Sequence, residues 1–123
     1  MNSESKIVPD VLDKMCPSRI VLNHVTSRWG VLVLIVLQSQ TLRFSELRRV
    51  IGDVSEKMLS QTLKTLEQDG FVHRKSFNVV PPHVEYSLTP HGHGVAVHVK
   101  ALASWVEDNI MDLPDARDTS RSK

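Results

Sequence analysis

The apolar residues of this chain recur with different periods in different segments, and the changes of period predict its elements. Between residues 55 and 69, Leu59, Leu63 and Leu66 recur at three- and four-residue steps, which predicts an amphipathic helix. The helix would begin at a serine cap and end at Gly70, because glycine adopts the left-handed conformation at no steric cost.

A shorter helix is predicted just before this one. Ser45 is expected to cap it, and the helix runs through Val50 with Leu47 and Val50 facing inward. Residues 51–54 then form a turn in which Gly52 can take a positive φ. Two amphipathic helices joined by such a turn are typical of a helix-turn-helix.

Two strands are predicted after the helix-turn-helix. Residues 72–77 and 83–88 are strand-like, and Pro81-Pro82 keeps the tip between them extended. Residues 41–43 can form a short strand that pairs with this hairpin. A helix-turn-helix followed by a hairpin predicts a winged helix.

The flanking segments predict further helices. Pro17 suits the first position of a helix with Cys16 as its N-cap, and Thr89-Pro90 begins a helix that continues to about Met111. Residues 29–37 are apolar almost all round, which predicts a buried helix. Their β-branched content would also allow a strand, but the neighbouring helices need a central partner. The apolar positions of the last helix are Val95, Val99, Leu102, Trp105, Val106 and Ile110.

These elements predict an α+β, mostly helical fold, a winged helix-turn-helix with flanking N- and C-terminal dimerisation helices. We expect a flexible lead-in over residues 1–14, one winged-helix domain over residues 15–112 and a disordered tail over residues 113–123.

Composition narrows the class of protein only slightly. A hydrophobic fraction of 41% and a charged fraction of 24% are ordinary for a globular domain, and the net charge of +1 alone does not indicate nucleic acid. Basic residues nevertheless outnumber acidic ones between residues 43 and 75. One cysteine excludes an intrachain disulfide. The N-terminus lacks the apolar core of a signal peptide, and the apolar run at residues 30–37 is too short to span a bilayer, so we expect a soluble, cytoplasmic protein.

The outward face of the 55–69 helix carries the functional argument. Lys57, Gln61, Lys64 and Gln68 form a row of hydrogen-bond donors opposite the leucines. Lysine suits the acceptors of guanine and glutamine suits adenine, so this face can read a major groove. A solvated polar face is the alternative for an isolated helix, but the neighbouring turn and wing favour DNA. The predicted base readers are Ser55, Lys57, Ser60 and Gln61, with Lys64 at the edge or on phosphate.

Cations on both sides of this helix suit the DNA backbone. Arg43, Arg48 and Arg49 are predicted to contact phosphates, although one of them can simply be a solvated arginine. Arg74, Lys75 and His83 lie on the predicted wing and can reach the backbone or the minor groove.

Several ordered blocks resemble the HxlR family of winged-helix transcription factors, relatives of the MarR group. They are Met15-Cys16-Pro17, Arg28-Trp29, LRFSELRR at residues 42–49, SEKMLSQTLKTLE at 55–67, Gly70 and VPPHVEYSLT at 80–89. The resemblance covers roughly residues 15 to 107. It implies a homodimer, built by the N- and C-terminal helices, that binds an inverted repeat near a promoter, and we expect a repressor.

Three positions depart from the usual pattern of that family. His83 stands where a more basic residue is frequent, Thr62 where arginine is common, and Arg28 where lysine is common. The first two changes weaken expected contacts with the DNA backbone. We therefore expect lower affinity or a weaker salt dependence than in typical relatives.

Cys16 is a candidate redox sensor. A thiol at a helix N-terminus has a lowered pKa and a raised reactivity, and some members of the resembled family sense oxidants or electrophiles at this position. As the only cysteine, it could form an intersubunit disulfide, a mixed disulfide or an alkylated thiol. The alternative is a small buried residue or a simple helix cap.

The sequence offers little support for other chemistry. His91, His93 and His98 lie close together but lack the partners of a tetrahedral metal site, so we expect no metal and no cofactor. No motif assembles a catalytic triad or a phosphate loop, which argues against an enzyme. The serious alternative to a DNA-binding regulator is a winged-helix adaptor for protein interactions, because the fold alone does not fix the function.

Overall fold

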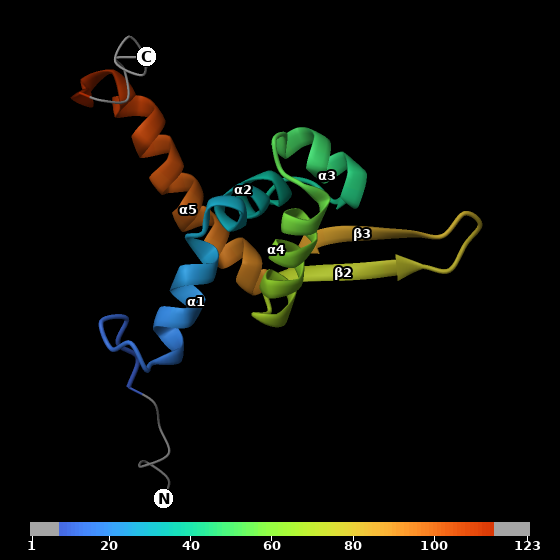
Figure 1. Cartoon of the computed structure of the whole chain (residues 1–123), viewed down its shortest axis with the longest axis horizontal. Helices are drawn as coiled ribbons and strands as arrows, with labels where there is room; N and C mark the ends of the chain where they lie inside the picture. The colour runs from blue at the N-terminus through green and yellow to red at the C-terminus, as the bar shows by residue number, and fades with distance from the viewer. Residues whose placement is uncertain (1–7, 115–123) are drawn as a thin grey trace, which may run out of the picture.

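A computed structural model describes residues 8–114 of the chain and shows a winged helix (Figure 1). The elements are, in order, α1 (Pro17–Val25), α2 (Arg28–Leu37), β1 (Leu42–Arg43), α3 (Phe44–Ile51), α4 (Glu56–Gln68), β2 (Val72–Phe77), β3 (His83–Leu88), α5 (Pro90–Asn109) and a final 3₁₀ turn, η2 (Ile110–Asp112). The α+β, mostly helical class is therefore confirmed, as is the winged helix-turn-helix.

The core forms around α2, as the run of apolar residues predicted. Val33, Leu34 and Leu37 of α2 are almost fully buried. The three inward leucines of α4 and Leu47 of α3 are buried in the same cluster. Residues 29–37 are thus a helix and not a strand, and each of them is buried or half-buried.

The sheet has three antiparallel strands in the order β1-β3-β2. Val72 pairs with Leu88 and Phe77 with His83, so both strands of the hairpin have the predicted bounds. The short strand that we placed at residues 41–43 is confirmed at Leu42–Arg43, which pairs with Tyr86 and Glu85 of β3. The hairpin extends well beyond the helices (Figure 1).

The start of α3 differs from the prediction. Its N-cap is Arg43, not Ser45, because β1 leads into the helix without a loop. The backbone N–H of Arg43 donates to Oε1 of Glu46 at 2.8 Å and so has a partner inside the first turn. Val50 was also expected inward but is 55% exposed. Phe44, Leu47 and Ile51 make the inner face instead, since they pack against the core at three- and four-residue steps.

The turn between α3 and α4 and the ends of α4 follow the prediction. Gly52 has φ 69°, and the next residue, Asp53, also has a positive φ of 50°. Oγ of Ser55 accepts the backbone N–H of Met58 at 3.0 Å and caps α4. Gly70, with φ 89°, follows the end of the helix. These local signals fix the length of α4.

Thr89 joins the sheet to the last helix, as its position before Pro90 predicted. Its Oγ1 accepts the backbone N–H of Gly92 at 2.9 Å and donates to the carbonyl of Gly70 at 2.6 Å. Its backbone N–H donates to the carbonyl of Phe71 at 3.0 Å. The start of α5 is therefore bonded directly to the turn that follows α4.

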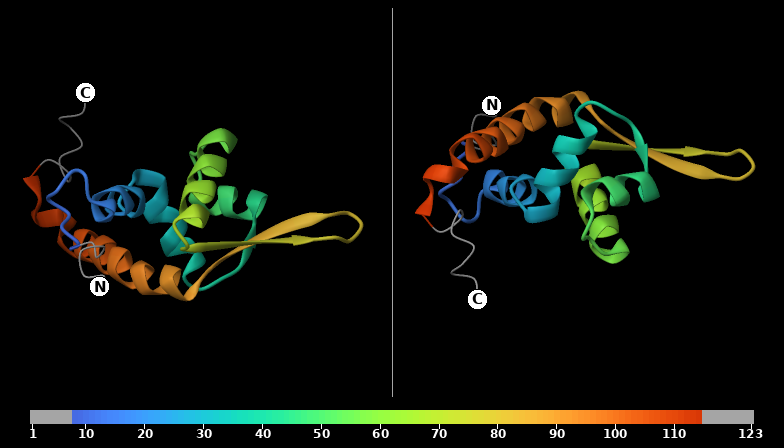
Figure 2. Two further views of the ribbon diagram at one scale, coloured as in Figure 1. Left: turned by 90° about the horizontal axis from the view of Figure 1, so that it is seen from below. Right: turned by 90° about the horizontal axis from the view of Figure 1, so that it is seen from above.

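The two outer helices extend away from the reading elements. Figure 1 shows α1 and α5 on one side of the molecule and α3, α4 and the hairpin on the other. Both views of Figure 2 show α5 running back from the sheet, with α4 standing out from the rest of the chain. The molecule thus has a helical half at the termini and a half that contains the helix-turn-helix and wing.

The chain ends are only partly described. Within the expected lead-in, residues 11–14 form turns and a bend, and the carboxylate of Asp10 accepts the N–H of Leu12 at 3.0 Å. Residues 1–7 of that lead-in and 115–123 of the expected tail lie outside the described residues. Among residues 8–114, no single helix is long and apolar enough to cross a membrane; α1 and α2 together reach that length and hydropathy, but they are bent by 70°.

Candidate nucleic-acid interface

The outward face of α4 is exposed along its whole length. Ser55, Lys57, Ser60, Gln61 and Lys64 are all open to solvent, while the leucines of the same helix are buried. Because α4 stands out from the body, this face is the one that can enter a groove (Figure 2). Ser55 uses its oxygen to accept from Met58, so its hydroxyl hydrogen is still free to donate.

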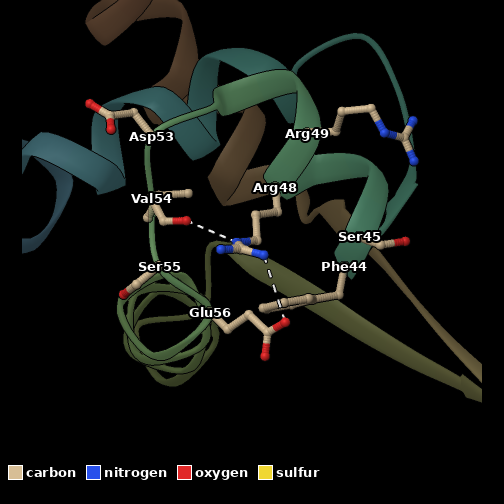
Figure 3. Close-up of a pocket in the computed structure, with 8 residues that line it drawn as sticks. All are labelled: Phe44, Ser45, Arg48, Arg49, Asp53, Val54, Ser55 and Glu56. Atoms are coloured by element: carbon tan, nitrogen blue, oxygen red, sulfur yellow. Dashed lines mark hydrogen bonds and ion pairs between the residues drawn. The ribbon is translucent and has the colours of Figure 1, made fainter.

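A groove of about 500 Å³ separates α3 from the start of α4 (Figure 3). Arg48 lies within it, and its Nε donates to the carbonyl of Val54 at 2.9 Å. Nη1 of the same side chain lies 3.7 Å from the carboxylate of Glu56, the first residue of α4. Arg48 therefore braces the turn as well as adding charge, a role that we did not predict.

Arg49 and Arg43 have a simpler setting. Arg49 and Ser45 line the same groove, and in Figure 3 both side chains point away from Arg48. Both arginines are exposed. Cations at the first helix of a helix-turn-helix suit contacts with the DNA backbone.

A second groove of about 310 Å³ lies between α4 and the sheet. It brings together Ser60 and Lys64 of α4 with Arg74 of β2, three residues that we predicted to contact DNA. Leu63, Glu67 and Tyr86 complete its lining. Two cations and a hydroxyl in one groove beside the reading face can hold a phosphate oxygen.

Two side chains of the wing, His83 and Lys75, contact the ring of Phe77. The ring of His83 stacks on the ring of Phe77, with 4.6 Å between centroids. Nζ of Lys75 lies 5.0 Å from the centroid of the Phe77 ring. Nε2 of His83 is also 3.4 Å from the carboxylate of Glu85. His83 is therefore committed to neighbours within the wing, while Arg74 and Lys75 are exposed.

Comparison with known proteins identifies the chain. The family model described as HxlR-like helix-turn-helix matches residues 24–114. The chain belongs to the HxlR-like helix-turn-helix family. The HTH-type transcriptional regulator YtfH of Escherichia coli (strain K12) is 61% identical over 105 residues, which cover 85% of this chain and 83% of that relative.

Solved structures agree with this assignment. The transcriptional regulator ytfH from Salmonella typhimurium is 57% identical and superposes with a TM-score of 0.83, covering 90% of this chain and 99% of that structure. The oxidised form of the redox regulator HypR is 35% identical, with a TM-score of 0.70 over 76% of this chain and 97% of that structure. The HxlR-like chain is thus a transcriptional regulator with a DNA-binding helix-turn-helix, and not an enzyme.

Cys16 of this HxlR-like protein is the N-cap of α1, as predicted, and is 6% exposed. Its thiol lies 3.4 Å from Oγ of Ser18. Hydrogen bonding with Ser18, and then with the backbone of Asp10 and of Ser18, lowers the pKa of the thiol, although burial and the charge of Asp13 oppose the shift. The lowered pKa raises the fraction of the thiolate, the reactive form, at a given pH.

The histidines considered for a metal site do not converge. Among residues 8–114, no three side chains of the metal-binding types are grouped closely enough to hold an ion. Another histidine, His24, lies 2.7 Å from Asp69 at the end of α4. Sequence reasoning missed this pair because its members are 45 residues apart. A histidine in the last turn of α1 gave no signal for its distant partner.

Proposed function

We propose that this HxlR-like regulator is a homodimeric repressor that binds an inverted repeat in promoter DNA. The observation that carries the proposal is the row of exposed donors on α4, a helix that stands out between the cations of α3 and those of the wing. Ser55, Lys57, Ser60 and Gln61 would contact base edges, because the first turns of a recognition helix reach deepest into the groove.

The remaining cations would contact the DNA backbone. Lys64 and Arg74 share the groove between α4 and the sheet, so they are suited to one phosphate. Arg43 and Arg49 would contact the phosphates of the DNA strand that passes α3. Lys75 would contact the DNA backbone beside the wing. Arg48 would add charge while it holds the turn. His83 contributes least, because it stacks on Phe77 and lies beside Glu85.

The proposed dimer would form through the outer helices. Leu102, Trp105 and Met111, on and just after the second half of α5, are 60%, 56% and 71% exposed, and Ile20 of α1 is 52% exposed. Large apolar side chains that are exposed on both outer helices are expected to be covered in an assembly. A two-fold dimer would place its recognition helices one turn of DNA apart, roughly 34 Å.

Cys16 is proposed as the sensor of this repressor. The lowered pKa of its thiol supports reaction with oxidants or small electrophiles, and the resemblance to the redox regulator HypR supports the same idea. Modification of a thiol that is 6% exposed would push apart the groups packed around the start of α1. Because α1 is assigned to the dimer, the change would reach both recognition helices.

An electrophoretic mobility assay tests the proposal. The wild type and Gln61→Ala are each titrated onto the upstream region of the protein's own gene. Both proteins are also titrated onto an unrelated duplex of equal length. We expect a shift for the upstream region at concentrations at least tenfold lower than for the unrelated duplex. Equal affinity for both duplexes would favour the adaptor and reject the repressor.

A second assay isolates the sensor. The upstream region is titrated with reduced, diamide-treated and iodoacetamide-treated protein, and with Cys16→Ser under the same three conditions. We expect the treatments to weaken binding of the wild type and to leave Cys16→Ser unchanged. Loss of binding in both proteins would show that another group carries the response, while no change in either would make Cys16 structural.

A further inference from the structure

The end of α4 is tied to α1 by one short side-chain contact. Nδ1 of His24, in the last turn of α1, lies 2.7 Å from Oδ2 of Asp69, the residue that follows the last turn of α4. The side chain of Asp69 is 13% exposed and that of His24 is 33% exposed. A hydrogen bond in this setting is partly shielded from water and holds a defined distance between the two helices.

Val25 of α1 packs in the same core as the leucines of α4, but part of the seam between these helices is open. A cleft of about 190 Å³ lies there, lined by Asn23, His24, Ser27, Gln61, Thr62, Thr65 and Leu66. Side chains that face a cleft lose contacts with atoms across it, so they resist sliding less than a filled interface would. Throughout residues 8–114, the bond from His24 to Asp69 is the only hydrogen bond between α1 and the segment that forms and ends α4.

Both partners are held firmly by their own surroundings. The carbonyl of His24 accepts from Oγ of Ser27 at 2.8 Å, and a side chain at Gly30 would overlap the same carbonyl, so α2 begins directly against it. The backbone N–H of Asp69 donates to the carbonyl of Thr65 at 3.0 Å. A link between two rigid ends transmits a displacement of one helix to the other.

We propose that His24 and Asp69 are positioning residues that set the spacing between half-sites which the dimer accepts. The inference rests on the proposed function, because it requires a dimer on an inverted repeat. If α1 belongs to the dimer scaffold, the link fixes where each recognition helix stands relative to the two-fold axis. One added base pair moves a half-site by about 3.4 Å and turns it by about 35°, so a rigid dimer loses contacts on it.

The test compares three duplexes that carry the repeat selected by the wild type. One has the selected spacer, one is a base pair longer and one a base pair shorter. We expect the wild type to bind the altered spacers about tenfold or more weakly. His24→Ala and Asp69→Ala should reduce this discrimination to about threefold or less, and the double variant should discriminate no less than either single variant, since both changes remove one link.

Two further variants separate positioning from general stability. His24→Asn places an amide nitrogen near the position of Nδ1, so it should keep the discrimination between spacers that His24→Ala loses. His91→Ala removes an exposed histidine at the start of α5 and should behave like the wild type. Should the alanine variants fail to fold, Asp69→Leu, which removes the acceptor oxygens and keeps a similar size, takes their place.

The outcomes distinguish this inference from the function on which it rests. If the wild type selects no repeat, the proposed function is wrong. A wild type that discriminates between spacers, together with variants that lose affinity for all three duplexes equally, would overturn the positioning role alone. Loss of spacer discrimination with unchanged base preference inside each half-site would support it.

Discussion

Two glycines near the start of α5 give the sharpest test of the fold, because they are two residues apart and lie in opposite surroundings. A Cβ at Gly92 would overlap the carbonyl oxygen of Phe71 and would lie 3.1 Å from Cβ of Leu88. A Cβ at Gly94 would meet nothing within 4 Å. Gly92→Ala and Gly94→Ala therefore add the same group to the same helix with opposite expected effects.

The magnitudes follow from the contacts at each site. Overpacking against backbone costs about 2 kcal/mol. The required shift also strains the hydrogen bond from Thr89 to Phe71, which is worth about 1 kcal/mol. Gly92→Ala should then destabilise by about 2 to 3 kcal/mol, after a gain of about 0.5 kcal/mol from replacing glycine in a helix. Gly94→Ala should stabilise by about 0.5 to 1 kcal/mol.

Urea unfolding followed by circular dichroism measures the difference. Both variants and the wild type are compared at one protomer concentration, because the stability of a dimer depends on concentration. The expected gap between the variants is about 3 kcal/mol, the sum of the two opposite effects. Equal midpoints for the two variants would refute the close approach of α5 to Phe71 and, with it, this account of how the wing is anchored.

The other predictions concern DNA and the thiol. Gln61→Ala should relax the preference at one base position of each half-site, and an unchanged selected sequence would show that the reading face is wrongly assigned. Arg49→Ala should weaken binding to all sequences alike and lower the salt slope by about 0.9 per site, whereas an unaltered slope would place Arg49 off the backbone. Arg48→Lys should keep the salt slope but lower affinity, because lysine has no Nε to brace Val54, and wild-type affinity would show that the brace is dispensable. Since the pKa of Cys16 is lowered, its alkylation should accelerate at a lower pH than that of a cysteine peptide, and coincident pH profiles would contradict that shift.

Local signals made much of the reading half predictable. The serine cap and Gly70 fixed the ends of α4, and short strand-like runs around a Pro-Pro tip placed β2 and β3 at their observed residues. The burial of the leucines in α4 also placed Lys57 and Gln61 outward. Each of these features depends on residues within a few positions of one another, which a periodic pattern records directly.

Long-range contacts explain what the sequence did not predict. The N-cap of α3 is Arg43 and not the predicted Ser45, because β1 pairs with β3, some forty residues away along the chain, and α3 begins directly after β1. The brace from Arg48 ends on a backbone carbonyl, which leaves no mark in a pattern of side chains. The pair of His24 and Asp69 needs the packed fold to bring α1 beside the end of α4.

Selection of bound fragments from genomic DNA by the purified, reduced protein tests the central claim most directly. The account predicts enrichment of one inverted repeat whose half-sites are centred about 10 base pairs apart, the distance expected for two recognition helices on one face of the duplex. It also predicts that Gln61→Ala selects the same spacing with a relaxed base. If the wild type enriches no repeat, α4 does not read DNA sequence and the winged helix serves another partner.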